Sequence, residues 1–495
     1  MVKKRFDGKR GVFLTIIMAA CLAFFCCGCD RSGDTEIYVS AEAGDDETGK
    51  GTQKRPWKTI VKGIDELGKD GKDTLVIRAG SYYVPDEIQM RRSGSAERSL
   101  IIRSFPGERV VLSNERDGVC THGSRFILNI KRDDSYQGLE HITIEGLHFI
   151  GGITIGGSDQ TCRNIRLESC TFTAHGADLG PDNPSLIYLR GTEDCSIRNC
   201  TLFCDDRRLN DFSGIKIWSG TKRLIVENNE IYGLARKGID NKHGKPDQAL
   251  VIRNNYIHHL NERAININAD GTVIENNVIY HCPAGINIWK ESGSPGGSFS
   301  IINHNTIVDC DIGIMLEPES SGKLRGCRVT NNLLVNCGRG GFGAFNISPY
   351  RRTPYAHGHY SNHNCFYHAE ARHSVRDRDD ILYNLPQWQE VSELDGASIE
   401  MNPGFMLVEN GETSLCGFRV SDAFGRDGRT RGDDGCTMGA NVVSMPDGGC
   451  RLVVCAGGGA VRSGEQKISG VPGEREERSA GVPSPPRNVR VPGRK

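Results

Sequence analysis

Lys242, Asp240 and Arg263 have the side chains that are needed to remove a proton from a carbon acid. Asp240 and Lys242 both lie in the segment GIDNKHG, and Arg263 follows about one sequence repeat later. A lysine can act as a general base when burial and neighbouring charges lower its pKa. A cation such as Arg263 or Lys216 can neutralise the carboxylate next to the carbon that loses its proton. The pattern predicts β-elimination from a uronate sugar, with Asp240 either holding a calcium ion or pairing with a lysine.

The elements that must position these residues come from an internal repeat. Five segments each align on one asparagine, in steps of 26, 22, 28 and 27 residues: LIVENNEI (Asn229), LVIRNNYI (Asn255), TVIENNVI (Asn277), SIINHNTI (Asn305) and RVTNNLLV (Asn332). The pattern extends to further positions, which are Leu147, Cys170, Cys200 and Asn364. A coil of this length holds short strands that cannot bury their own inward face, so successive coils must stack. A stacked buried asparagine can bond to the coils above and below it, whereas an unpaired amide would be penalised.

A second short strand follows each asparagine strand: GIKIWSG, GIDNKHG, AININAD, GINIWKE and GIMLEPE. Alternation points the isoleucines inward and the residues between them outward. Stacking then predicts an exposed wall with two columns. The first column is Lys216, Asp240, Asn266, Asn287 and Met315; the second is Trp218, Lys242, Asn268, Trp289 and Glu317, with His243, Asp270, Lys290 and Glu319 at the margin.

Two features indicate that this wall binds carbohydrate. Asn241 occupies an inward position where the neighbouring coils have Ile or Leu, and such exceptions are expected near functional sites. Trp218 and Trp289 face outward, and flat aromatic rings stack on sugars. The predicted substrate-binding residues are Trp218, His243, Asn266, Asn268, Trp289, Lys290 and Glu317. The alternative is a mixed polar sheet face whose tryptophans are covered by a loop.

The repeat resembles the right-handed parallel β-helix superfamily that contains the pectate lyases. The N-terminal segment from IYVSAEAGDD to SLIIRSFPGERVVLS and the later segments NPGFMLVENGE and GDDGCTMGANV resemble the two ends of such proteins, so the resemblance covers about 36–442. It implies an all-β solenoid, namely a single-stranded right-handed parallel β-helix. It also implies a short capping helix from Trp57 to Leu67 over the open end of the core.

A looser resemblance links DNKHG, RNNYIHH and NERAININADG to the chondroitinase B and alginate lyase family. It implies Lys242 as the base and Arg263 as the assisting cation. Two features depart from that family. Ala235, Arg236 and Lys237 stand near the place of its acidic metal ligands, and Asn268, Ala269 and Asp270 replace its arginine-histidine-glycine triplet. Whether Asp240 binds a calcium ion is therefore left open by the sequence.

The N-terminus predicts export and a lipid anchor. A basic start precedes an apolar run that is too short to span a bilayer, and the run ends in FFCCGC. We expect residues 1–29 to be a lipoprotein signal peptide in which Cys29 is lipidated. Cys26 and Cys27 are alternative lipidation sites, and the alternative to a lipoprotein signal is an ordinary cleaved signal peptide.

Many later cysteines fall at positions that need a small buried side chain, which favours reduced core thiols over disulfides. Residues 443–495 are rich in Gly, Pro and Arg and predict a disordered tail.

Composition limits the partners. The chain has 61 basic and 62 acidic residues, so no long-range field favours nucleic acid. Our leading hypothesis is an envelope-anchored lyase acting on a uronate-containing polysaccharide. The alternative is a non-catalytic carbohydrate-binding or structural surface protein. A glycoside hydrolase, which needs clustered carboxylates such as Asp205 and Asp206, is a lesser alternative.

Overall fold

The structure is a computed structural model that describes most of the chain between residues 35 and 400. The described ranges omit 117–118, 121–125, 132–137, 159–160, 175–184, 205–211, 246, 291–295, 319–323, 348–357, 369–372 and 378, and beyond 400 they comprise only four short strands. The chain divides into one unit, Met1–Cys455, and a second unit, Ala456–Lys495, in which no residue is described. The predicted signal, Cys29, Asp205, Asp206, Glu319 and almost all of the predicted tail therefore lie outside the described residues.

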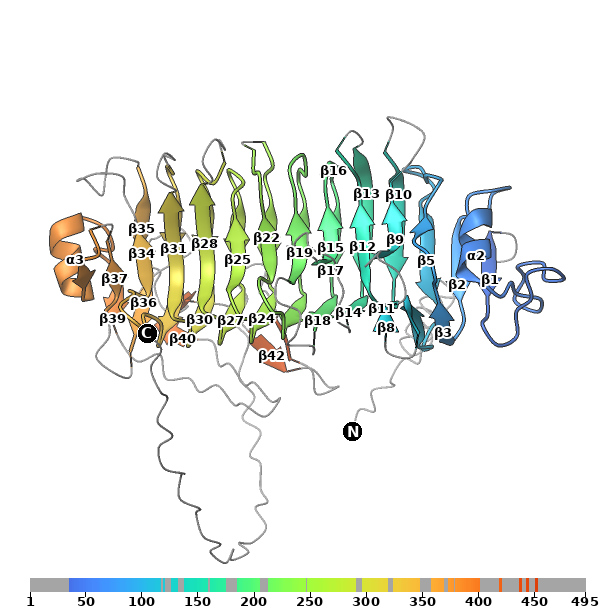
Figure 1. The fold of residues 1–495 in the computed structure, drawn as a ribbon. Coiled ribbons are helices and arrows are strands. Elements are labelled where there is room, and N and C mark those ends of the chain that lie inside the picture. The colour runs from blue at the N-terminus through green and yellow to red at the C-terminus, as the bar shows by residue number, and fades with distance from the viewer. Residues whose placement is uncertain are drawn as a thin grey trace, which may run out of the picture. The chain divides into compact units, whose positions relative to one another are not determined.

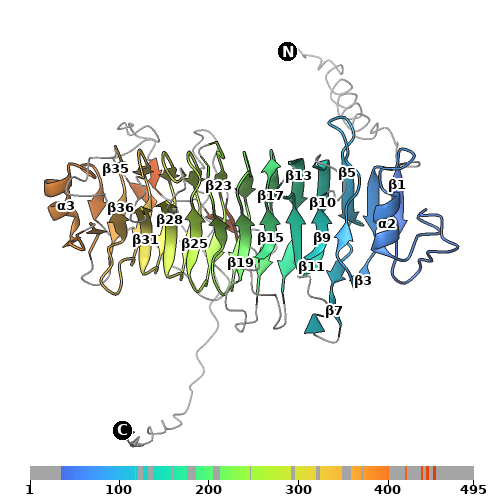
Figure 2. The ribbon, with the colours of Figure 1, turned by 45° about the horizontal axis from the view of Figure 1, so that its top comes forward.

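Three parallel sheets form the wall of the solenoid, and each coil adds one strand to each sheet (Figure 1, Figure 2). Sheet 1 contains β1 (Glu36–Val39), β2 (Thr74–Ile77), β5 (Leu100–Ser104), β10 (Glu140–Glu145), β13 (Cys162–Glu168), β16 (Thr192–Glu193), β17 (Ser196–Arg198), β20 (Ile225–Glu227), β23 (Val251–Arg253), β26 (Val273–Glu275), β29 (Ile301–Asn303), β32 (Arg328–Thr330) and β35 (Tyr360–Asn362). Sheet 2 contains β3 (Gly80–Tyr83), β6 (Val110–Ser113), β11 (His148–Ile150), β14 (Thr171–Thr173), β18 (Thr201–Phe203), β21 (Glu230–Tyr232), β24 (Tyr256–His258), β27 (Val278–Tyr280), β30 (Thr306–Val308), β33 (Leu333–Val335), β36 (Cys365–Tyr367) and β39 (Ile399–Glu400).

Sheet 3 follows sheet 2 in each coil and contains the predicted wall. Its strands are β4 (Ile88–Gln89), β9 (Phe126–Ile130), β12 (Gly152–Ile155), β15 (Ser185–Leu189), β19 (Ser213–Ile217), β22 (Ile239–Asn241), β25 (Arg263–Ile267), β28 (Ala284–Lys290), β31 (Ile312–Pro318), β34 (Phe345–Ile347), β37 (Val375–Arg376) and β38 (Leu382–Tyr383). Only the last pairing, β37 with β38, is antiparallel. Small antiparallel pairs outside these sheets are β7 (Glu115–Arg116) with β8 (Val119–Cys120), β40 (Phe418–Val420) with β41 (Cys436–Met438), and β42 (Val442–Ser444) with β43 (Cys450–Leu452).

The asparagine ladder lies at the turn between sheets 1 and 2, as predicted. In each coil the amide oxygen accepts both the backbone N–H and the side-chain N–H of the preceding ladder asparagine, at 2.9–3.1 Å, from Asn229 through Asn255, Asn277, Asn305 and Asn332 to Asn364. The ladder starts where Cys200 N donates to Asn229 Oδ1 and ends where Asn364 N donates to Ser398 Oγ. Its buried amides are thus paired from coil to coil.

Two helices lie at the ends of the stack of coils (Figure 1). The predicted capping helix is present as α2 (Ile60–Glu66), with Thr59 as its N-cap. Its Gly63 lies so close to β1 and β2 that an added Cβ would meet Val39 and Leu75 side chains at 2.7 and 2.8 Å. The second helix, α3 (Leu385–Ser392), was not predicted. Its signal was the capping box of Asn384 and Gln387 with a proline between them.

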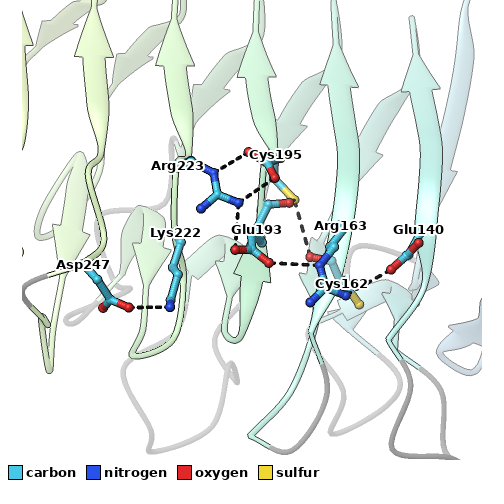
Figure 3. A network of polar contacts seen from close by, with 9 residues as sticks. Glu140, Cys162, Arg163, Glu193, Cys195, Lys222, Arg223 and Asp247 are labelled. Carbon is cyan, nitrogen blue, oxygen red and sulfur yellow. Dashed lines mark hydrogen bonds and ion pairs between the residues drawn. The ribbon is translucent and has the colours of Figure 1, made fainter. Parts of the chain in front are cut away.

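Ion pairs link successive coils along the side of sheet 1 (Figure 3). Arg163 contacts Glu140 at 3.1 Å and Glu193 at 2.9 Å, and Arg223 contacts Glu193 at 2.7 Å. Lys222 pairs with Asp247 in the same row. Because these side chains are largely exposed, each pair adds little to the free energy of unfolding.

Ten described cysteines are buried and none of them is in a disulfide, which agrees with the predicted core thiols. Burial raises the pKa of Cys195 and of Cys327 to about 12, so the reactive thiolate is scarce. We therefore expect iodoacetamide to leave these ten thiols unmodified in the native protein and to alkylate them after unfolding in urea. Peptide mapping by mass spectrometry checks this, and rapid native alkylation of Cys195 or Cys327 would contradict the described burial.

Candidate functional site

The residues of the first predicted column are paired with one another on sheet 3, as the sequence predicted. Lys216 pairs with Asp240, Asp240 with Asn266, Asn266 with Asn287 and Asn287 with Met315 across β19, β22, β25, β28 and β31. Continuing the same register places Lys242 beside Asn268, and Trp289 pairs with Glu317. Stacking therefore brings together residues that lie more than 20 positions apart in the sequence.

The prediction that the first column is exposed is wrong. Lys216 is only 3% exposed, and Asp240, Asn266 and Asn287 are each 1% exposed. The last three are hydrogen bonded to one another: Asn287 Nδ2 donates to Asn266 Oδ1 at 2.9 Å, and Asn266 Nδ2 donates to Asp240 Oδ1 at 2.8 Å. Alternation predicts which way a side chain points, but it does not predict how closely neighbours pack over it. Met315 is half-buried.

The second column is partly exposed, with one exception. Trp218, Lys242, Trp289 and Glu317 are half-buried, and so is Lys290 at the end of β28. The exception is Asn268, which is fully buried, so the prediction that it faces solvent is wrong. Its side chain accepts from Gly244 N at 2.8 Å and donates to Trp289 O at 3.2 Å. Asn268 therefore stabilises the turn that follows β25.

Asn241, the exception among the inward isoleucines, is buried and paired. Its Oδ1 accepts from Asn268 N at 3.0 Å, and its Nδ2 donates to Ile217 O at 3.3 Å. The amide thus connects the coil before it to the coil after it. These hydrogen bonds explain why a polar residue occupies this buried position.

Aromatic and charged side chains surround the trailing edge of sheet 3, where its strands end. Lys216 Nζ lies 5.3 Å from the centre of the Trp218 ring, and the exposed His243 ring meets Trp218 edge-on at 4.5 Å. Burial raises the pKa of Asp270, although the Ser298 N–H and the charge of Lys290 oppose the rise. This edge therefore has a ring face and cations beside it, which suits a sugar with an acidic group.

A charged cluster that the sequence analysis did not identify lies at the leading edge of sheet 3, where its strands begin. Glu262 is its centre: it accepts from Arg236 Nε at 2.7 Å and from Arg263 Nη1 at 2.9 Å. Lys237 Nζ lies 3.7 Å from Glu262 Oε1 and 3.5 Å from Asp240 Oδ1. We call Arg236, Lys237, Asp240, Glu262 and Arg263 the leading-edge cluster.

Lys237 is the most unusual member of this cluster. It is 3% exposed, and burial lowers its pKa below the ordinary lysine value. Asp240 and Glu262 oppose this decrease, whereas Arg236 and Arg263 add to it. Among the described residues its ammonium group has these two long ion-pair contacts and no shorter hydrogen bond. A lysine in this environment can be deprotonated near neutral pH more readily than a solvated one.

The structure does not bring Lys242 and Arg263 together. The pairing of Ile239 with Ile265 places Lys237, not Lys242, beside Arg263, and Gly238 N donates to Arg263 O at 3.1 Å. Lys242 lies at the trailing edge, roughly 16 Å further along the strand direction at about 3.3 Å per residue. Arg263 instead contacts Glu262 and, at 3.8 Å, Glu317. The lysine paired with Asp240 is also Lys237.

Comparison with known proteins agrees with the described architecture. The family model described as "Right handed beta helix region" matches residues 129–296, which include the central coils of the three parallel sheets. The chain contains a right-handed parallel β-helix. This confirms the fold class predicted from the repeat.

Three known proteins are similar to parts of this chain. The uncharacterized protein YwoF of Bacillus subtilis (strain 168) is 25% identical over 340 residues, which are 66% of this chain and 67% of YwoF. Pectate lyase PEL9 of Emericella nidulans is 30% identical over 107 residues, which are 22% of this chain and 24% of the lyase. The crystal structure of pectate lyase Pel9A is 14% identical, with a TM-score of 0.43 over 61% of this chain and 76% of that one.

The leading-edge cluster of the β-helix does not fit a calcium ion. Calcium prefers six to eight oxygen ligands, but Lys237 occupies the space next to Asp240 and three cations surround Glu262. Among the described residues, no three His, Cys, Asp or Glu side chains converge on one point. The prediction that Asp240 pairs with a lysine therefore describes this β-helix better than the prediction that it holds calcium.

The sequence does contain a pattern that marks the leading edge of sheet 3, where its strands begin. Each wall segment begins with a small residue, and the column runs Gly214, Gly238, Ala264, Gly285, Gly313 and Ala344. A Cβ added at Gly238 would lie 2.6 Å from Ala264 O and 3.1 Å from the side chains of Ile257 and Leu260, so this column marks a tight corner. Lys237 and Arg263 both directly precede the small residue of their coil. The alignment of the wall segments on these small residues therefore already implied that Lys237 and Arg263 are neighbours, although the family resemblance had linked Arg263 to Lys242.

Proposed function

We propose that this chain is a lyase that cleaves a uronate-containing polysaccharide by β-elimination on the outer face of sheet 3. The observation that carries the proposal is Lys237, a buried lysine with a lowered pKa, held beside Arg263 in the next coil. A base and a cation at neighbouring positions are what this reaction needs.

In the proposed reaction the neutral amine of Lys237 takes the C5 proton of the uronate. The electrons of the C–H bond form a C4=C5 double bond, the bond from C4 to the glycosidic oxygen breaks, and that oxygen takes a proton from water. Arg263 lies beside Lys237 and is partly exposed, so it can bind the substrate carboxylate while negative charge develops there. Asp240 and Glu262 keep Lys237 in position.

The charge on this face supports an acidic substrate. Over the coils from β19 to β31, seven described basic side chains lie on or beside the wall with five carboxylates. The basic residues are Lys216, Arg236, Lys237, Lys242, Lys245, Arg263 and Lys290, and the acidic ones are Asp240, Glu262, Asp270, Asp311 and Glu317. An excess of positive charge on a chain whose net charge is −1 raises the local concentration of a polyanion. Similarity of one segment to a pectate lyase also supports a uronate substrate.

A second candidate function is non-catalytic binding of the same kind of polysaccharide. The 3% exposure of Lys237 favours this alternative, because a general base must contact the atom whose proton it removes. In this case Trp218, Trp289 and the partly exposed Lys242 at the trailing edge would hold the glycan. A glycoside hydrolase has less support, since the carboxylates of Glu262 and Glu317 both contact Arg263.

We expect the full chain to release unsaturated, ultraviolet-absorbing oligosaccharides from at least one uronate polymer. Polygalacturonate, alginate and chondroitin sulfate form a suitable panel, with a neutral glucan as the control. The rise in ultraviolet absorbance measures the double bond, and a reducing-sugar assay measures all cleavage. Cleavage without absorbance would indicate a hydrolase. Binding to the polymers without any cleavage would support the second candidate and overturn the first.

We also propose that the chain works outside the cytoplasm, attached to the cell envelope by a lipid on Cys29. The cysteine-containing sequence after the apolar run supports this proposal. Among the described residues no helix is long and apolar enough to cross a membrane. The replacement Cys29→Ala should move the protein from the membrane fraction to the soluble fraction, and an unchanged membrane fraction would contradict an anchor at this residue.

A further inference from the structure

Two histidines from successive coils meet at the corner between sheets 2 and 3. His259 directly follows β24, and His281 occupies the same position after β27. Both have left-handed backbones, with φ angles of 53° and 51°, so their side chains leave the corner in the same way. Their rings are perpendicular, with centres 5.1 Å apart. The sequence did not show this pair, because their separation of 22 residues becomes short only when one coil stacks on the next.

The ring nitrogens of this pair lie close together. His259 Nε2 is 3.3 Å from His281 Nδ1, and the other nitrogen of His259, Nδ1, is 2.9 Å from His258 Nδ1. Without another ligand, each contact requires a proton between the two nitrogens. A metal ion can take the place of such a proton, since imidazole binds metals through the same lone pair.

A carboxylate lies beside the Nε2 atom of each of the outer two rings. Glu230 Oε1 lies 3.5 Å from His258 Nε2, and Asp309 Oδ2 lies 3.6 Å from His281 Nε2. A carboxylate at Nε2 favours a proton on that nitrogen and leaves the lone pair on Nδ1, which faces His259 in both rings. The pattern of a carboxylate behind a histidine is typical of metal ligands, because it fixes the tautomer and the ring orientation. Arg339 in turn holds Asp309, at 3.2 Å.

We propose that His259 Nε2 and His281 Nδ1 bind a divalent transition-metal ion at this corner. Two nitrogens bound to one tetrahedral zinc ion, at about 2.0–2.1 Å each, lie roughly 3.3–3.4 Å apart. The observed separation is 3.3 Å. His259 is exposed, so an ion can reach the pair from solvent. No third His, Cys, Asp or Glu converges there among the described residues, so the other coordination positions of the ion are left for solvent water.

The chemistry of the donors selects the class of ion. Two imidazoles favour zinc, copper or nickel over calcium or magnesium, which prefer oxygen ligands. Since each ligand comes from a different coil, the bound ion connects the coil of β24 to the coil of β27. The site does not depend on the proposed lyase activity. Its occupancy can be measured by binding alone.

Isothermal titration of the metal-free, untagged full chain with zinc chloride tests the proposal. We expect one zinc ion per chain and at least tenfold weaker binding in His281→Asn and His259→Asn. Asparagine is chosen because it tolerates the left-handed backbone of these positions. His373→Asn, which changes another exposed histidine, is the matched control and should bind zinc like the wild type. Magnesium chloride should give no binding.

Two further measurements distinguish a ligand effect from a folding effect. Asp309→Asn removes the carboxylate beside His281 together with its ion pair to Arg339, and we expect roughly 10-fold to 100-fold weaker zinc binding with both histidines retained. Zinc should also raise the melting temperature of the wild type but not that of His281→Asn, because an ion that binds only the folded chain stabilises it. No zinc binding by the wild type, or equal affinity in His281→Asn, would overturn the proposal.

Discussion

Replacing Lys237 with methionine should lower the rate of uronate cleavage by about 10²-fold to 10⁴-fold, which is the usual contribution of a positioned general base. Methionine has a similar length and fits the buried position, but it cannot accept a proton. The rate constant kcat/KM on the most active polymer of the panel measures the effect. Lys242→Met is the matched comparison, since Lys242 comes from the same coil and lies at the trailing edge.

The pH dependence of cleavage tests the same residue in a second way. The reaction needs the neutral amine, and burial lowers the pKa of Lys237 in the folded protein. The active fraction should therefore rise with pH and level off at a pH below the ordinary lysine value of about 10.4. A profile that keeps rising up to that value would indicate a solvated lysine as the base.

Lys237→Arg separates a catalytic role from a structural one. Arginine keeps a positive charge between Asp240 and Glu262, but it does not deprotonate at accessible pH. We expect Lys237→Arg to keep the melting temperature close to that of the wild type and to lose activity like Lys237→Met. If Lys237→Arg stays active while Lys242→Met is inactive, Lys242 is the base and the sequence-based assignment was correct.

Replacing Asn305 with alanine should lower the free energy of unfolding by about 3–5 kcal/mol. The change removes the acceptor of Asn277 N and Nδ2 and the donor to Asn332 Oδ1 and Ile274 O. Each buried group left without a partner costs about 1–3 kcal/mol. The midpoint of urea unfolding, followed by circular dichroism, measures the loss.

Cys170→Ala is the matched control for Asn305→Ala. Cys170 occupies the ladder position of an earlier coil, but its thiol makes weak contacts, which are to Ile144 O, Glu168 O and the thiol of Cys200. We expect a loss of about 1 kcal/mol, the typical cost of a small change in a core. Equal losses in the two variants would show that the ladder bonds add nothing beyond packing.

The fold could be predicted from the sequence because one position of the repeat is under strict geometric control. Each ladder asparagine bonds to its counterparts in the neighbouring coils, so the residue recurs at the turn between sheets 1 and 2 in six successive coils, from Asn229 to Asn364. Once Asn255 and Asn277 are aligned, the inward isoleucines of sheet 3 and the register of Lys216 with Asp240 follow by alternation. These features depend on local pattern and coil length alone.

The candidate site was less predictable, for two reasons. The resemblance to a lyase family linked Arg263 to Lys242, but a shared motif does not fix where a residue lies along its strand, and the predicted register of Gly238 with Ala264 already implied that Lys237 lies beside Arg263. Burial of an outward side chain also depends on what packs over it. The sequence therefore identified the direction of Asp240 correctly but not its burial or its contact with Lys237.

The constant geometry of the asparagine ladder has a consequence for how such a chain can change in length. Successive ladder asparagines are separated by 22 to 32 residues, yet their bonds stay between 2.9 and 3.1 Å. Extra residues are therefore accommodated in the other turns and leave the stacking interface of each coil unchanged. A whole coil, for example residues 256–277, is a unit that can be deleted or duplicated without breaking the columns on either side. Loss of a few residues from within a strand would shift every later column. The molecule is modular along its axis, and insertions can enlarge one wall while the core stays the same.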